Sequence, residues 1–289
     1  MKIAIHDSDA TKYPNLALMK IAAHHRNTGD LVEWFNPLVG GYDRVYSSQV
    51  FTWSRRDPYL PGDAVCGGTG HDITATLPEE IEHICPDYSL YGCSESYGFL
   101  TRGCIRSCEW CFVPAKEGHI KAHADIEEFA RHRDVVLMDN NVLAHSHGLD
   151  QIDKIGRLGL RVDFNQGLDA RLIDASAGRR LGKLKWIRHI RLACDTSAQI
   201  EMIRRAVEVL RWHNVNPAQI FCYVLVRDVA DAIERVRFLK GIYVVPFAQP
   251  YRAPDGAEPT AEQKAFARWC NHRAIYKTCT WEDYRRKAA

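Results

Sequence analysis

Short apolar runs alternate with longer segments of helical periodicity along the first part of the chain. Residues 2–7 have a strand pattern that ends in polar side chains, and residues 16–26 repeat apolar side chains at helical spacing. Gly29 follows that helix, in a place where glycine commonly ends one. Further strand patterns occupy 31–35, 43–48 and 63–68. Strands that alternate with helices predict a small Rossmann-like α/β domain over residues 1–92.

The same alternation continues after residue 92. Strand patterns occupy 97–101, 134–139, 160–164, 187–193, 220–226 and 242–247. Helical patterns lie between them at 125–132, 149–158, 168–181, from Ser197 onward and at 228–240. Six strands suit a partial (β/α)6 TIM-like barrel over 93–255 better than a complete eightfold barrel. The last segment, 256–289, is polar with aromatic anchors such as Phe266 and Trp269, and we expect a helical extension there.

The composition is that of an ordinary globular protein, with 46% hydrophobic and 26% charged residues among 289. No run of 18 apolar residues occurs, so we expect no membrane span. The net charge of +2 argues against a protein that is basic over its whole surface, but it leaves a local basic patch open. Ten cysteines without an apolar leader segment favour a reducing, cytoplasmic location over a disulfide framework.

Three cysteines in one short run are the strongest chemical signal. Cys104, Cys108 and Cys111 have the spacing C-x3-C-x2-C. Cysteine thiolates hold iron–sulfur clusters, and three of them leave one iron of a cubane cluster open to a further ligand. Zinc is the alternative, with Cys93 or His119 as fourth ligand of a structural or nucleic-acid-binding module. Zinc sites more often pair two C-x2-C units, and no second pair occurs, so the spacing favours iron and sulfur.

Polar residues follow several of the predicted barrel strands. They are Asp139-Asn140-Asn141, Asn165-Gln166 and Asp195-Thr196. The carboxyl ends of barrel strands meet on one face, and the cysteine run follows the first barrel strand onto that same face. Polar strand ends are common in any fold. Their recurrence here nevertheless favours a functional site around the cysteines.

The cysteine run, with Trp110 just before its third cysteine, resembles the signature of the radical S-adenosylmethionine superfamily. The order of elements, the glycine-rich turn 66–70 and the segment 97–104 resemble the subgroup with an N-terminal cobalamin-binding-like domain. This resemblance implies an enzyme with a [4Fe–4S] cluster and S-adenosyl-L-methionine as cofactors. Such an enzyme cleaves S-adenosylmethionine reductively and starts radical chemistry on a substrate, which the sequence does not specify. A flavodoxin- or ferredoxin-like one-electron reductant is the implied partner.

The resemblance also implies roles for residues at the strand ends. Asp139, Asn140 and Asn141 stand where the family binds the methionine ammonium group, and Asp195 matches a family carboxylate near the ribose. Phe112 follows the cysteine run, in a place suited to flank the adenine. The expected cofactor-binding residues are Trp110, Phe112, Asp139, Asn140, Asn141, Gln166 and Asp195, with Cys104, Cys108 and Cys111 as ligands of the cluster.

Cobalamin is where the chain departs from this subgroup. The motif D-x-H-x-x-G, which supplies a cobalt-ligating histidine, is absent, and Asp7-Ser8-Asp9 stands in its place. At about 90 residues the first domain is also small. We therefore expect a reduced cobalamin-binding-like domain that holds no cobalamin. A cobalamin-dependent radical methyltransferase is the alternative.

One basic stretch suggests contact with phosphates. It comprises Lys183, Lys185, Arg188 and Arg191. A solvated helix end and the outer rim of a strand explain it more simply. Nucleic acid is therefore left open as a partner, without being favoured.

Overall fold

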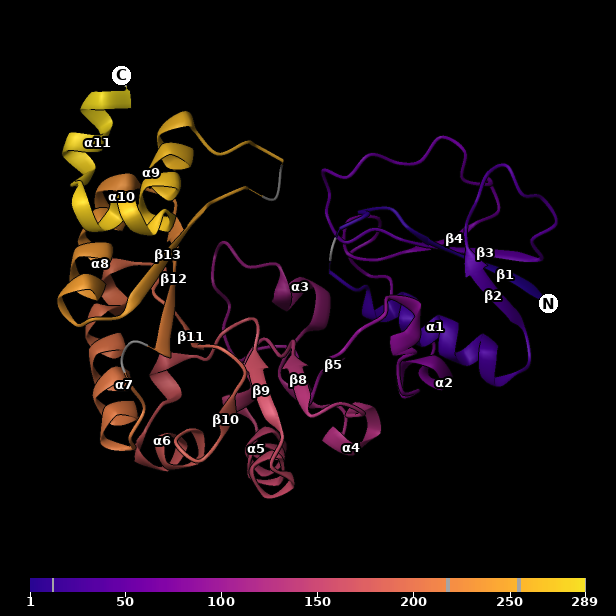
Figure 1. Ribbon diagram of the computed structural model, residues 1–289, viewed down its shortest axis with the longest axis horizontal. Coiled ribbons are helices and arrows are strands. Elements are labelled where there is room, and N and C mark those ends of the chain that lie inside the picture. The colour runs from indigo at the N-terminus through magenta and orange to yellow at the C-terminus, as the bar shows by residue number, and fades with distance from the viewer. Residues whose placement is uncertain (12, 217–218, 254–255, 289) are drawn as a thin grey trace.

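The computed structural model describes residues 1–11, 13–216, 219–253 and 256–288. The chain forms a smaller N-terminal lobe and a larger C-terminal lobe, each with helices packed against parallel strands (Figure 1). The expected α/β class with parallel sheets is therefore confirmed. None of the helices in the described ranges is long and apolar enough to cross a bilayer.

A four-stranded parallel sheet in the order β2-β1-β3-β4 forms the N-terminal lobe. Its strands are β1 (Lys2–Asp7), β2 (Leu31–Trp34), β3 (Arg44–Ser48) and β4 (Val65–Gly67). Its helices are α1 (Leu16–Asn27), α2 (Glu79–Glu82) and the 3-10 turn η1 (Tyr88–Leu90). Because β1 has a partner on both sides, its apolar side chains Ile3 and Ile5 are fully buried. Ala4 between them is fully buried too, as the short continuous apolar run at the N-terminus predicts.

The strands of the C-terminal lobe form two parallel sheets. The first contains β5 (Ser96–Gly98), β8 (Asp134–Leu137), β9 (Arg161–Phe164) and β10 (Lys185–Trp186), and the second contains β11 (Ile190–Ala193), β12 (Ile220–Val226) and β13 (Val245–Pro250). A parallel bridge between Leu168 and Leu192 connects them. The strands thus succeed one another in chain order, as a partial barrel requires. Formation of the barrel itself stays a prediction.

Helices of the C-terminal lobe cover one side of these strands. They are α4 (Ile126–Phe129), α5 (Ser146–Leu158), α6 (Ala175–Leu181), α7 (Ile200–Trp212) and α8 (Val229–Gly241), with 3-10 turns η2 (Val142–Ala144), η3 (Ala170–Leu172) and η4 (Ser197–Gln199). In β12, Cys222 and Val224 are fully buried in the same core as the helices, whereas Phe221 and Tyr223 alternate with them and are only half-buried. β12 therefore buries one face under helices and keeps a second face that is only partly buried.

Two separate hydrophobic cores follow the division of the chain. One extends from Ile3 to Leu90, and the other from Leu100 to Trp281. The expected boundary near residue 92 falls between them. The C-terminal helices α9 (Ala261–Asn271), α10 (Arg273–Thr278) and α11 (Trp281–Ala288) attach to the second core through buried rings such as Phe266 and Trp269.

Some elements differ from the sequence prediction for local reasons. The helix expected over 168–181 is split, because the side chains of Asp169 and Asp174 each accept a backbone N–H and start separate turns. The strand expected from residue 242 begins at Val245, because Tyr243 has a left-handed backbone with φ of 58° and ends α8 in a turn. The strand expected over 187–193 begins at Ile190.

Arg235 is the largest fully buried side chain and fastens α8 to the strands. Its guanidinium donates to the carbonyl oxygens of Cys194 at 2.6 Å and Leu225 at 3.0 Å, and it pairs with Asp231 at 2.7 Å. These carbonyls lie at the ends of two neighbouring strands. A buried cation is stable there only because oxygens surround it.

We predict that Arg235→Leu lowers the free energy of unfolding by about 2–4 kcal/mol, because two buried carbonyls lose their donor. Urea denaturation measures this change. Arg237→Leu on the same helix is the control, since Arg237 is exposed and its pair with Glu282 lies in solvent. An equal loss in the two variants would contradict the role given to Arg235.

Candidate functional site

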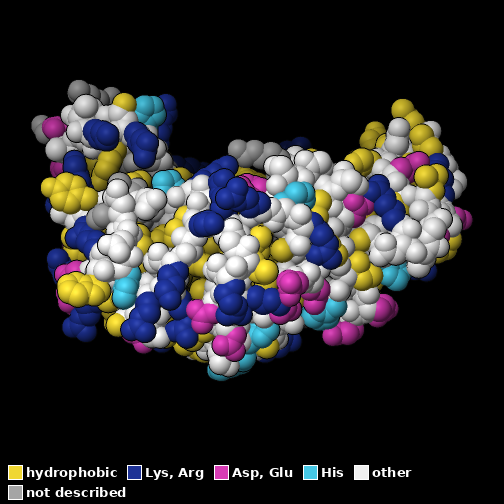
Figure 2. Space-filling view, turned by 60° about the horizontal axis from the view of Figure 1, so that its bottom comes forward, with side chains coloured by type: hydrophobic (Ala, Val, Ile, Leu, Met, Phe, Trp, Pro, Cys, Tyr) yellow, Lys and Arg dark blue, Asp and Glu magenta, His cyan; other side chains and the backbone are white. Residues whose placement is uncertain are grey.

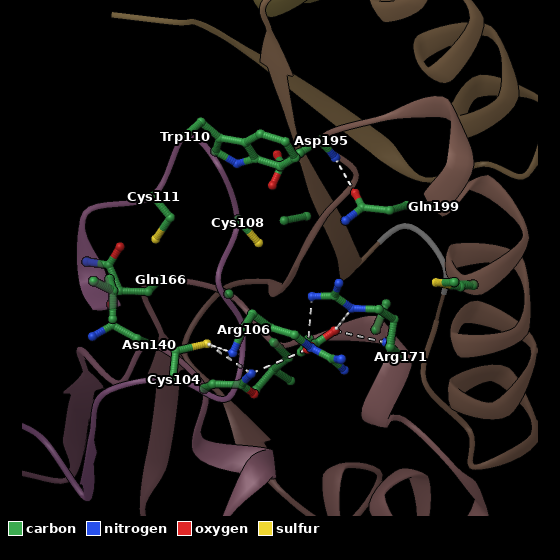
Figure 3. Close-up of a pocket in the computed structure, with 18 of the residues that line it drawn as sticks. Cys104, Arg106, Cys108, Trp110, Cys111, Asn140, Gln166, Arg171, Asp195 and Gln199 are labelled. Atoms are coloured by element: carbon green, nitrogen blue, oxygen red, sulfur yellow. Dashed lines mark hydrogen bonds and ion pairs between the residues drawn. The ribbon is translucent and has the colours of Figure 1, made fainter. Parts of the chain in front are cut away.

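A pocket of about 310 Å³ lies where the cysteine run meets the carboxyl ends of the strands (Figure 3). All three cysteines line it, and so do six of the seven residues expected to bind the cofactor: Trp110, Phe112, Asn140, Asn141, Gln166 and Asp195. These residues come from segments that are distant in sequence, after β5, β8, β9 and β11. The fold therefore gathers nearly the whole expected site.

The cysteine loop, residues 103–118, leaves a two-stranded antiparallel ribbon of β6 (Thr101–Arg102) and β7 (Lys121–Ala122) and ends in α3 (Val113–Glu117). Gly103 has a φ of 81°, and a Cβ there would lie 2.4 Å from the carbonyl oxygen of His119. Only glycine fits this start of the loop without a shift of the backbone. The Cys104 N–H donates to Gly118 across the base of the loop at 3.3 Å.

Glu117 holds the base of the cysteine loop against the sheet. Its carboxylate accepts the Gly103 N–H at 2.8 Å and the Asn140 side-chain amide at 2.9 Å, and it pairs with Arg102 at 3.0 Å. The Glu117 side chain is only 9% exposed. One buried carboxylate thus joins the loop to the end of β8.

Asp169 holds the other side of the loop. Its carboxylate pairs with Arg106 at 3.0 Å and Arg171 at 2.6 Å, and it accepts from the Asn141 amide at 3.3 Å. Burial raises the pKa of Asp169, but the two guanidinium groups outweigh burial and hold that pKa below its usual range. Asp169 is therefore ionised and fixes Arg106, inside the cysteine run, to the loop after β9.

Cys104 accepts two hydrogen bonds from nitrogen. The Arg106 backbone N–H and the Asn141 side-chain amide each lie 3.4 Å from its sulfur. Burial raises the pKa of the other two thiols, Cys108 and Cys111. A positive metal centre would reverse that effect, since a coordinating thiol is deprotonated outright.

Asn141 carries a free acceptor into this pocket. The residue is only 2% exposed, and its side-chain Oδ1 has no hydrogen-bond partner within the described ranges. A buried acceptor without a donor is costly unless a ligand supplies one. Three thiols and an unpaired amide oxygen in one pocket fit a thiolate-held cluster with a polar ligand beside it.

The three thiols are not preassembled around a metal. Among the described residues, no group of three His, Cys, Asp or Glu side chains, these cysteines included, is arranged to hold an ion. Neither Cys93 nor His119, the expected fourth ligands for zinc, lines the pocket. Cys93 packs instead against the core of the N-terminal lobe.

Asp195 lies on the opposite wall of the pocket, beside Trp110 (Figure 3). Burial raises the pKa of this carboxyl, against a hydrogen bond from Trp110 and the charge of Arg235. Its backbone N–H donates to Gln199 at 2.5 Å. Arg227 covers the outer face of Trp110, with its guanidinium 5.0 Å from the ring centre. The carboxyl group is thus shielded and faces the pocket.

A second, more open pocket adjoins the first at Asp195. It is lined by Asp195, Thr196, Arg227, Asp228, Asp231 and Tyr251, and has a volume of about 410 Å³. Arg227 also lies over the Tyr251 ring, 5.6 Å from its centre. The two pockets therefore share Asp195, and the second is large enough for a further small molecule.

Asp139 is the one expected cofactor residue that does not line the pocket. Its carboxylate, 2% exposed, accepts the N–H groups of Leu100 and Thr101 at 3.1 and 2.6 Å and the Thr101 hydroxyl at 2.7 Å. The carboxylate oxygens of Asp139, which were expected to bind the methionine ammonium group, are thus engaged by the chain's own donors. Asp139 fixes the strand segment that leads into the cysteine loop.

Sequence reasoning missed several residues of the site. Arg106, Asp169 and Gln199 line the pocket, and Glu117 anchors the loop beneath it. Arg106 could have been noticed as a cation between two cysteines. Glu117 carries no signal of its own, since its role depends on contacts with residues 14 and 23 positions away.

If the N-terminal lobe bound cobalamin, the ligand would lie at the carboxyl ends of β1 and β3, where parallel sheets of this type bind ligands. The chain's own loop occupies this edge. Asp9 accepts the N–H groups of Val50 at 2.6 Å and Phe51 at 3.2 Å, and His6 contacts Ser47 at 2.9 Å and Asp57 at 3.3 Å. These residues do not fit cobalamin, because the groups that would face it are engaged with loop 49–57.

Comparison with protein-family models and with curated proteins gives no match for this chain.

Asp139 makes stability depend on pH. Burial raises its pKa from 3.8 to about 6, against its hydrogen bonds. Between pH 3.8 and about pH 6, Asp139 therefore holds a proton in the folded protein but not in the unfolded chain. This contribution is fully present below the lower value and is lost as the pH rises through about 6.

We predict that this group makes the protein about 1 kcal/mol more stable at pH 5 than at pH 7. Urea unfolding at both pH values measures the difference, and Asp139→Asn should remove that part of it. The same pH dependence in the wild type and in Asp139→Asn would show that Asp139 does not titrate in this range.

Proposed function

We propose that this protein is a radical S-adenosylmethionine enzyme whose cluster is held by Cys104, Cys108 and Cys111. The observation that supports this most is the convergence of these three thiols with the buried free acceptor of Asn141 in one pocket. When bound, a [4Fe–4S] cluster supplies the electron that cleaves S-adenosylmethionine and starts radical chemistry on a substrate. A flavodoxin- or ferredoxin-like protein would deliver that electron.

The chain's own residues hold and orient what enters the pocket. The Asn141 oxygen accepts a hydrogen bond from a ligand N–H group, and the Asp195 carboxyl is placed for a hydroxyl or amino donor on the opposite wall. Trp110 and Phe112 supply aromatic surface in the same pocket. S-adenosylmethionine offers a partner to each of these groups: its amino group suits the Asn141 acceptor, its ribose hydroxyls suit the Asp195 carboxyl, and its adenine ring suits an aromatic surface.

The arginines near the cysteines place fixed positive charge beside the thiols. Arg106 and Arg171 line the pocket and are both paired with Asp169, so their positive charges stay beside the thiols. Fixed cations favour thiolates over thiols. We also propose that the parallel strands form an open (β/α)6 barrel, since this arrangement brings their carboxyl ends around the pocket.

The direct test is formation of 5′-deoxyadenosine from S-adenosylmethionine by anaerobically reconstituted protein with dithionite, measured by mass spectrometry. We predict product from the wild type and a loss of at least about 100-fold in Cys104→Ala, because the cluster loses a ligand. Cys66→Ala, in β4 of the other lobe, is the matched control and should keep the activity. Equal product from Cys104→Ala and the wild type would refute the proposal.

Asn141 provides a second, spectroscopic test. Its amide donates to the Cys104 sulfur, and hydrogen bonds to cluster sulfurs raise the reduction potential by favouring the more negative, reduced form. We therefore predict a lower midpoint potential in Asn141→Leu, measured by potentiometric titration followed by electron paramagnetic resonance. Gln166→Leu, which lines the same pocket, should leave the potential unchanged. An unchanged potential in Asn141→Leu would remove this role.

A further inference from the structure

A basic surface lies at the end of the C-terminal lobe where the strands begin, opposite the end that carries the pocket. The segment 175–194 contains six Lys and Arg residues and no Asp or Glu. Arg180 and Arg191 pair with Asp153 and Asp163. Lys183, Lys185 and Arg188 are exposed and form no ion pair within the described part of the chain. These three cations are available to an external anion.

Two exposed aromatic rings lie at the same end. Trp212, the last residue of α7, is 85% exposed, and Tyr243, after α8, is 80% exposed. Tyr243 has the left-handed φ of 58°, an unfavourable conformation for a bulky residue, in the turn that leads to β13. Neither ring contributes to the core of the lobe.

Contacts between the helix ends bring the segments that carry Lys183, Trp212 and Tyr243 together. A Cβ on Gly182 would lie 2.5 Å from the carbonyl oxygen of His213, so the segment that carries Lys183 lies against the end of α7. Arg211 donates to the carbonyl oxygen of Ile242 at 2.5 Å and so links the ends of α7 and α8. Figure 2 brings this end of the molecule forward and shows Lys and Arg side chains gathered on it.

Helix dipoles explain only part of this charge. Cations are favourable near helix C-termini, which accounts for Arg179 in α6 and for Lys185, whose ammonium lies 3.6 Å from the position of a Gly159 Cβ at the end of α5. Lys183 and Arg188 flank β10 outside the helices. The dipoles also give no reason for exposed rings beside the cations.

We propose that this basic–aromatic face, formed by Lys183, Lys185, Arg188, Trp212 and Tyr243, binds single-stranded nucleic acid. Cations that meet phosphates and rings that stack on unpaired bases are the two components such surfaces combine. An acidic protein would need the cations but not the rings. The face lies away from the cysteine pocket, so this binding does not depend on the proposed cofactor chemistry.

The experiment measures fluorescence anisotropy of labelled 15-residue oligonucleotides, single-stranded RNA and single-stranded DNA, with a labelled polyglutamate peptide as the base-free anion. We expect at least one oligonucleotide to bind more tightly than polyglutamate, with an affinity that falls as salt rises. Lys183→Glu/Lys185→Glu should weaken binding at least tenfold and make the slope of log affinity against log salt shallower by about 1.4, for two lost phosphate contacts. The oligonucleotide that binds identifies the type of nucleic acid.

Trp212→Ala separates stacking from charge. It should weaken binding of the oligonucleotide by about tenfold and leave binding of polyglutamate unchanged, because only bases stack on the ring. Arg268→Glu/Arg273→Glu is the control with the same change in charge, on exposed residues of α9 and α10 away from β10 (Figure 1).

Three results would overturn the proposal. One is the absence of binding to either oligonucleotide at low salt. Another is an equal effect of the two double variants, which would mean that only total charge matters. The third is equal affinity for polyglutamate with no effect of Trp212→Ala, which would assign the face to acidic proteins. Circular dichroism of every variant confirms that the fold is retained.

Discussion

The site depends on two buried carboxylates that fasten the cysteine loop to the sheet. Glu117 joins Gly103 at the start of the loop to Asn140 at the end of β8, and Asp169 joins Arg106 within the loop to the segment after β9. The loop has little core of its own, since Cys111 and Phe112 are exposed. Charge-assisted hydrogen bonds therefore fix the conformation of the loop, which hydrophobic packing does not do here. Loss of either carboxylate would leave cations and N–H groups without a partner.

The N-terminal lobe supports this arrangement from the side of β5. The Tyr88 hydroxyl donates to the carbonyl oxygen of Phe129 at 2.7 Å, and Gly98 leaves room for the Phe129 ring, which a Cβ would approach to 2.5 Å. Glu82 joins Lys20 of the same lobe to His123 of the other. Burial raises the pKa of Glu82, but His123 and Lys20 outweigh burial and lower it to about 2. The lobe therefore acts as a support for the strand from which the cysteine loop departs.

The sequence predicts helices and strands best where the hydrophobic periodicity is strong. It predicts site residues best where they lie close together in the chain, as the three cysteines do. The run at Ile220–Val226 and the helix after Asp228 are predicted closely, since one alternates strictly and the other has a clear cap. The split at Asp174 and the turn at Tyr243 depend on side-chain caps and backbone conformation that periodicity does not contain. Asp139 illustrates the limit for the site, because a carboxylate at a strand end suits a ligand and a neighbouring backbone equally well. Only the three-dimensional contacts with Thr101 distinguish the two.

The metal content of anaerobically purified protein tests the central claim most directly. Iron, acid-labile sulfide and zinc are measured in the wild type and in a Cys104→Ala/Cys108→Ala/Cys111→Ala variant. The account predicts about four irons and four sulfides per wild-type chain, with the Mössbauer signature of a [4Fe–4S] cluster, and none in the variant. About one zinc and no iron per wild-type chain would contradict it and would make the cysteine loop a structural zinc site.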